Sequence, residues 1–151
     1  MGSVTTSTTI DADIQVVFDY VTDYRTAVGY SRDLKKWDPV TEVTDDIGAQ
    51  FDASLQLGPK AFESRVEVDS RSEPDAFGWS SISGFHHSGR YTFAPAGEGR
   101  TEVTFVFDYT LPGGMAGRLL ARTTEPLLKA SLANNLKTLK KQVEERARAT
   151  G

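Results

Sequence analysis

Apolar residues in the C-terminal part of the chain recur at intervals of four, four, three and four positions. They are Leu128, Leu132, Leu136, Leu139 and Val143. This spacing places them in one stripe along one side of a helix. Such a helix, from Glu125 to Arg148, is roughly 36 Å long at about 1.5 Å per residue, which is enough to lie across a whole sheet. We therefore expect the upstream sequence to supply a sheet that wraps around this helix.

Pro126 lies near the start of this helical region and has no amide hydrogen to donate. A proline inside a helix removes one hydrogen bond and crowds the preceding turn. We therefore expect a kink or a fresh start between Thr123 and Pro126, with Met115–Arg122 as a separate leading segment.

Upstream of the helix, apolar and polar residues alternate in short runs, a period typical of strands with one buried face. Turn residues separate the runs, as at Gly58-Pro59. The pattern predicts six strands after Trp37, over residues 40–46, 51–57, 62–68, 77–81, 85–93 and 103–109. Because the connections are short, we expect an antiparallel meander.

The sequence before this meander combines one strand with helical segments. Val4–Ile10 is rich in Thr, Val and Ile, a composition that predicts a first strand. Apolar residues at helical spacing then predict a helix over residues 13–22. Residues 24–33 predict a short second helix or a turn, and Trp37-Asp38-Pro39 ends any helix there, since proline disfavours a helical conformation in the residue before it.

The composition indicates one globular domain over residues 1–151. A formal net charge of -4 disfavours nucleic acid as a partner, because proteins that bind nucleic-acid phosphates are usually basic. The chain has no cysteine, which excludes disulfides and thiolate chemistry and suits a cytoplasmic location. No secretory signal and no run of roughly 20 apolar residues is visible, so we expect no stable membrane insertion. We expect a monomer or a homodimer.

Several stretches resemble those of a known family. They are Ile10–Asp13 leading into the first helix, Trp37–Pro39, and Gly89–Pro95 followed by Gly99–Thr104. These stretches, and the order of the expected elements, are similar to the polyketide cyclase/dehydrase family of the START-like, Bet v 1-like (SRPBCC) superfamily.

The resemblance implies an α+β helix-grip fold. In that fold a seven-stranded antiparallel sheet wraps around a long C-terminal helix, two short helices follow strand 1, and a hydrophobic cavity lies between sheet and helix. Members of the family bind lipids, sterols, polyketides or plant hormones, and some are aromatases or cyclases. The same fold serves many functions, so the ligand has to be argued from the residues themselves.

Strand parity predicts which side chains face the helix. The inward set is mostly apolar, with a few polar groups among aromatic rings, which is typical of a small-molecule pocket. Together with residues of the final helix, the candidate ligand-binding residues are Ser64, Trp79, Ser81, His87, Tyr91, Phe105, Phe107, Tyr109, Leu132 and Asn135. The alternative is a filled core in which the polar groups bond to one another or to water.

Apart from tyrosines, His87 is the titratable residue whose side chain strand parity places on the inner face of the sheet. Beside Tyr91 and Tyr109 it could contact a ligand or move a proton near neutral pH. The alternative is a hydrogen-bonded core histidine. His86 is adjacent and points to the opposite face, so the pair cannot readily chelate one metal ion. We predict no metal site and no cofactor, and we assign no catalytic residue.

These observations favour the binding of a hydrophobic small molecule, such as a lipid or a polyketide-like compound, in an internal cavity for storage, transport or presentation. One alternative is a polyketide aromatase or cyclase, in which the cavity folds a reactive chain and His87 or a tyrosine moves protons. A further alternative is a protein-interaction module without ligand, with a filled cavity and an exposed apolar patch.

Overall fold

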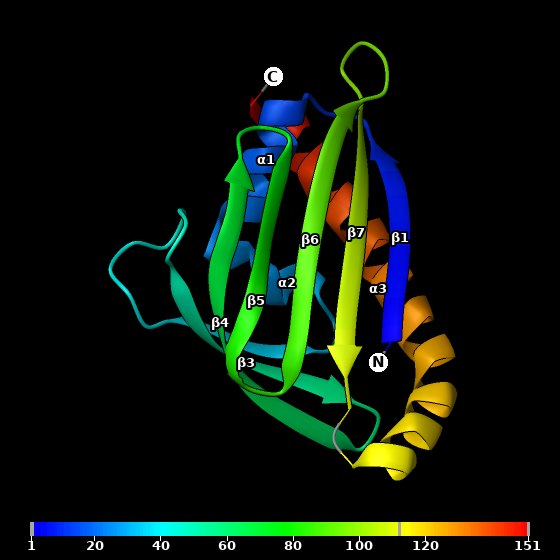
Figure 1. Ribbon diagram of the computed structural model, residues 1–151. Coiled ribbons are helices and arrows are strands. Elements are labelled where there is room, and N and C mark those ends of the chain that lie inside the picture. The colour runs from blue at the N-terminus through cyan, green and yellow to red at the C-terminus, as the bar shows by residue number, and fades with distance from the viewer. Residues whose placement is uncertain (1, 112, 151) are drawn as a thin grey trace.

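A curved antiparallel sheet covers one long helix in the computed structural model, which describes residues 2–111 and 113–150 (Figure 1). In chain order the elements are β1 (Gly2–Ile10), α1 (Ile14–Thr22), the 3-10 turn η1 (Tyr24–Thr26), α2 (Ala27–Tyr30), β2 (Leu34–Pro39), β3 (Gln50–Leu57), β4 (Lys60–Ser72), β5 (Ala76–Gly84), β6 (His86–Pro95), β7 (Thr101–Thr110) and α3 (Gly114–Thr150).

The seven strands form one sheet in the order β1-β7-β6-β5-β4-β3-β2. From β2 to β7 each strand pairs with the next one along the chain, and β1 then pairs with β7, so that every pairing is antiparallel. The two strands β1 and β7 run in register from Gly2 opposite Tyr109 to Ile10 opposite Thr101. The meander and the helix-grip architecture expected from the sequence are therefore confirmed.

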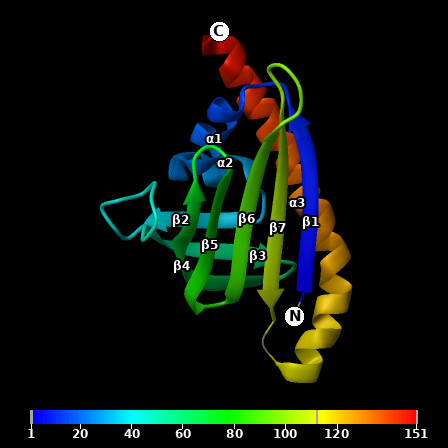
Figure 2. The same cartoon turned by 45° about the horizontal axis from the view of Figure 1, so that its top comes forward.

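The long helix α3 runs along the concave face of the sheet, and its C-terminal half lies beside α1 (Figures 1 and 2). Four of the five residues of its apolar stripe are buried there, with Leu139 and Val143 fully inaccessible to solvent, and Leu132 is partly buried. Polar contacts tie the same helix to the end of β1, because Lys140 Nζ donates to the carbonyl of Thr9 at 2.9 Å. The core therefore lies between α3, α1 and the inner face of the sheet.

The fresh start expected near Pro126 is wrong, because α3 is one continuous helix from Gly114 to Thr150 with Pro126 inside it. The kink expected there stays a prediction. The separate leading segment Met115–Arg122 is likewise part of that helix. Pro126 leaves the carbonyl of Arg122 without its usual helical donor. Both residues are exposed, so water can take the place of the missing amide.

The short strand expected over Val40–Asp46 is also wrong. Residues 40–49 form a loop, and the edge strand β2 lies earlier, at Leu34–Pro39. Trp37 is the buried side chain of β2, so this strand shows no apolar alternation. In the loop, Val43 and Ile47 are 54% and 59% exposed, because no neighbouring strand covers them. A β-prone composition therefore does not form a strand there without a partner to pack against.

The helical segments upstream follow the prediction. The expected helix over residues 13–22 is α1, which buries Val17, Phe18 and Val21 against the sheet. The ambiguous region 24–33 contains η1 and α2, two short turns of helix. Among residues 2–111 and 113–150, no helix is long and apolar enough to span a lipid bilayer.

The β4–β5 pairing contains two register shifts, and Gly84 lies next to the first of them, opposite Ser64. Gly84 has a φ of +80°, and a Cβ there would lie 2.4 Å from the carbonyl oxygen of Glu63. Both the backbone conformation and the contact therefore require glycine. This close approach accompanies the hydrogen bond from the backbone N–H of Phe85 to the carbonyl of Glu63 at 2.9 Å.

We predict that Gly84→Ala lowers the free energy of unfolding by more than about 2 kcal/mol, because it combines a left-handed conformation with a backbone clash. The matched control is Gly99→Ala, where φ is +68° but no atom lies within 4 Å of the added Cβ; its loss should be about 1 kcal/mol. Urea unfolding of the two variants measures the difference. Equal losses would contradict the account of Gly84.

Candidate functional site

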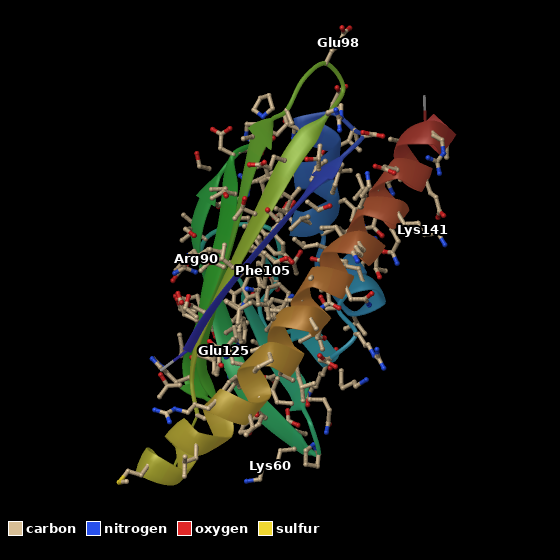
Figure 3. The ribbon with its side chains drawn as sticks, turned by 90° about the vertical axis from the view of Figure 1, so that its right-hand side faces the viewer. Lys60, Arg90, Glu98, Phe105, Glu125 and Lys141 are labelled. Carbon is tan, nitrogen blue, oxygen red and sulfur yellow. The ribbon has the colours of Figure 1, made fainter. Side chains whose placement is uncertain are left out.

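A cavity of ≈ 80 Å³ lies between the sheet and the helices. Its lining comes from strands β2 to β7 on one side and from α1, α2 and α3 on the other. Figure 3 shows Phe105 of β7 between the sheet and α3, while Arg90 of β6 points away from the helix on the outer face. The concave face of the sheet thus carries the apolar wall, and charged side chains such as Arg90 lie on its convex face.

Aromatic side chains form the floor of this cavity. The ring of Trp79 lies in edge contact with Trp37 at a centroid distance of 5.1 Å and 6.0 Å from that of Phe105. It passes over Gly89 on the neighbouring strand, where a Cβ would lie only 2.4 Å from Cζ2 of Trp79. Glycine at position 89 therefore makes room for the indole ring to lie flat on the sheet.

Two tyrosine hydroxyls meet at the cavity wall. The hydroxyl oxygens of Tyr30 in α2 and Tyr91 in β6 are 3.1 Å apart. Burial raises the pKa of Tyr30 to about 12, and burial also raises the pKa of Tyr91 well above its usual value. Both hydroxyls are therefore neutral near pH 7. One of them donates to the other, which leaves the second hydroxyl proton for another acceptor.

His87 is buried between aromatic rings on the same wall. Its ring stacks on Phe85 at 5.1 Å and lies 5.6 Å from the ring of Phe107. Nδ1 is 3.0 Å from the carbonyl oxygen of Phe85, which can only accept, so Nδ1 carries the proton and Nε2 is left as an acceptor. Burial lowers the pKa of His87 below its ordinary value, so the ring is neutral at pH 7.

A short segment after α2 is hydrogen-bonded to α3 across one side of the cavity. The backbone N–H of Arg32 donates to Oδ1 of Asn135 at 3.0 Å, and Oγ of Ser131 donates to a carboxylate oxygen of Asp33. Lining residues near this segment are only partly buried, namely Asp33, Leu34, Leu55 and Leu132, which we call the rim. The cavity therefore reaches solvent beside a polar contact between the Ser31–Asp33 segment and the helix.

Most of the residues proposed from the sequence lie on the lining of this cavity. They are Ser64, Trp79, His87, Tyr91, Phe105, Phe107, Leu132 and Asn135. Ser81 and Tyr109 lie outside it. Oγ of Ser81 accepts from the backbone N–H of His87 at 3.1 Å, so this side chain supports the strand that holds the histidine.

Tyr109 is buried near the end of β7, where its ring stacks on Phe107 and approaches Gly2 of the paired strand. Its hydroxyl is buried and has no hydrogen-bond partner among the described residues. Burial raises the pKa of this hydroxyl, with a further contribution from the charge of Glu125 on α3. Strand parity gave the correct face for Tyr109 but did not show that its ring packs towards β1 and does not line the cavity.

Several lining residues were not proposed from the sequence. Tyr30 and Trp37 come from α2 and β2, and Val21 and Thr22 come from the inner face of α1. Parity in the central strands carries no information about these segments. The apolar face of α1 and the aromatic residues between positions 24 and 37 were the available signal, because aromatic side chains bury large apolar areas and are therefore common in cores.

We predict that the buried, neutral His87 makes the protein less stable as the pH falls. The unfolded chain binds a proton near the ordinary histidine pKa of 6.5, whereas the folded chain binds it only at lower pH. The free energy of unfolding should therefore decrease as the pH falls from about 7 through 6.5 and should level off below the folded pKa.

Chemical unfolding between pH 5 and 8 measures this dependence. The chain has two histidines, so His86→Gln, at the exposed neighbouring position, is the matched control and should leave the dependence in place. His87→Gln should remove it. An unchanged pH dependence in His87→Gln would show that another group is responsible.

Comparisons with known proteins identify the family to which the chain belongs. A family model described as polyketide cyclase / dehydrase and lipid transport matches residues 1–144. A search of curated proteins returns no match.

Three solved structures illustrate the shared fold. The TTHA0849 protein of Thermus thermophilus is 20% identical with a TM-score of 0.83, covering 97% of this chain and 99% of its own. The Zhui aromatase/cyclase of Streptomyces sp. R1128 is 16% identical with a TM-score of 0.81, covering 99% and 98%. A START superfamily protein of Mycobacterium smegmatis is 15% identical with a TM-score of 0.67, covering 99% of both chains. The TM-scores show that these proteins share the fold of this chain, although the sequence identities are low.

The family model spans most of the chain, and the sheet and the long helix agree with the solved structures. The chain therefore belongs to the polyketide cyclase/dehydrase and lipid transport family and has the helix-grip fold.

Proposed function

We propose that this protein binds a hydrophobic small molecule, such as a lipid or a polyketide-like compound, and holds or presents it between the sheet and α3. The observation that carries the proposal is an aromatic cavity with polar groups on its wall that have no protein partner among the described residues. His87 Nε2 and the second proton of the Tyr30–Tyr91 pair are such groups. Apolar walls with a few polar groups are typical of sites for small organic ligands.

The size of the cavity implies that the protein opens when it binds. A volume of ≈ 80 Å³ holds a few water molecules, whereas pockets for drug-sized ligands occupy about 300 to 1,000 Å³. The rim is the place where opening costs least, because the contact between Ser31–Asp33 and α3 consists of hydrogen bonds that water can replace. Burial of ligand surface at roughly 25 cal/mol per Å² would drive the opening.

The first test is a titration with N-phenyl-1-naphthylamine, an uncharged apolar fluorophore. Both tryptophans of the chain, Trp37 and Trp79, line the cavity, so a bound probe should quench their emission while its own fluorescence rises. Ala53→Leu adds bulk to the lining and should weaken binding by about tenfold, or about 1.4 kcal/mol.

Ala94→Leu makes the same change at an exposed position of β6 and is the matched control, with affinity expected to stay within about twofold of the wild type. Thermal unfolding of both variants establishes that they are folded. If Ala53→Leu is folded and binds the probe as tightly as the wild type, the probe does not occupy this cavity.

A polyketide aromatase or cyclase is the second candidate, and the state of His87 is the observation that favours it. A neutral ring with its Nδ1–H bonded to a carbonyl presents Nε2 as a base. The test is turnover of a poly-β-ketone mimic, which His87→Gln should slow by about 10²- to 10⁴-fold if Nε2 accepts the proton. A wild-type protein that binds the mimic without converting it would exclude this candidate.

A further inference from the structure

We propose that the cavity selects uncharged ligands that carry a hydroxyl or carbonyl oxygen, and that it rejects carboxylates of the same length. This proposal rests on the proposed binding function and deepens it by naming the chemical class of the ligand. It separates ketones, phenols and alcohols, as in neutral lipids or polyketide-like compounds, from fatty acids and other organic anions.

The charge of the lining is the first argument. Among the lining residues that the structure describes, the one formal charge is the carboxylate of Asp33, at the rim, and none is a lysine or an arginine. A carboxylate that leaves water for such a surface loses its hydration without gaining a cation. An anionic group held at the rim instead would lie beside Asp33 and be repelled by it.

Three arginines of the sheet are paired with carboxylates and do not line the cavity. Arg71 lies over the ring of Phe18 on the inner side of β4, and its Nη2 donates to Oε1 of Glu73 at 2.9 Å. Nε of Arg65 donates to Oδ1 of Asp52 at 2.8 Å, and Nη2 of Arg90 donates to Oδ2 of Asp69 at 3.0 Å. Figure 3 shows Arg90 on the outer face, pointing away from α3. A rotamer change alone cannot bring a residue from the outer face of a strand into the cavity, because neighbouring side chains of a strand alternate between faces.

The polar groups of the lining are the second argument, since they are neutral and include donors as well as an acceptor. One hydroxyl of the Tyr30–Tyr91 pair donates to the other, so the proton of the second hydroxyl is free to be donated to a ligand. Nε1–H of Trp79 is a second donor, which is buried without an acceptor among the described residues. Nε2 of His87 accepts from a ligand hydroxyl. A ligand with a carbonyl and a hydroxyl oxygen can therefore bond to groups that the protein leaves unpaired.

Competition with three ligands of equal chain length tests the selection. Octan-2-one, octan-1-ol and octanoate are titrated at pH 7.5 against the bound N-phenyl-1-naphthylamine. We expect the ketone and the alcohol to displace the probe at concentrations at least tenfold lower than octanoate, since all three bury the same chain and octanoate alone is charged.

Leu55→Lys supplies the missing cation at the rim, from a partly buried position on β3. It should raise the affinity for octanoate relative to octan-1-ol by at least tenfold. Leu55→Gln, which is polar but uncharged, is the matched control and should leave the wild-type preference unchanged.

The outcomes distinguish this proposal from the function on which it rests. If the probe binds and octanoate displaces it as readily as octan-1-ol, the selection against anions is wrong and the binding function stands. If neither the probe nor any of the three ligands binds to the wild type, both proposals are wrong. Equal effects of Leu55→Lys and Leu55→Gln on octanoate would show that charge does not set the preference.

Discussion

The structure depends on the contact between the apolar stripe of α3 and the concave face of the sheet. Leu136, Leu139 and Val143 are almost completely buried in that contact, and each such side chain contributes about 1.5 to 3 kcal/mol through the apolar area it removes from water. The contact is closest where α3 lies along β1 and α1. The cavity lies between the other strands and the helices, and aromatic side chains such as Trp37, Trp79 and Phe105 line it. The same interaction therefore stabilises the fold and leaves room for a ligand.

The chemistry of the cavity follows from burial. Low exposure to water keeps His87 and the two tyrosines neutral, and β6 directs Arg90 to the convex face. What remains inside is a wall of aromatic rings with hydrogen-bond donors and an acceptor but no cation among the described lining residues. Such a wall suits an uncharged organic ligand, and a neutral histidine base also suits proton transfer. Binding and cyclisation therefore make the same demands on the wall and differ in whether His87 takes a proton.

Sequence periodicity predicted the parts of the fold that bury one face along a regular element. The stripe from Leu128 to Val143 and the alternating strands from Phe51 to Tyr109 are of this kind. It failed at β2, where Trp37 is the buried side chain, and at Pro126, where an exposed helix tolerates a missing donor. For the site, parity gave the face of a residue but not which inward side chains reach the cavity, so Tyr109 was assigned to the lining although its ring packs against Gly2 of β1. Tyr30 could not be found by parity, because a short helical turn brings it to the wall.

A crystal structure with a bound uncharged ligand such as octan-2-one tests the central claim most directly. The account predicts ligand density between α3 and the sheet, against Trp79 and Tyr91, with the Ser31–Asp33 segment or the adjoining part of α3 displaced outward. Ligand density on the outer surface, with the cavity unchanged at ≈ 80 Å³, would contradict it.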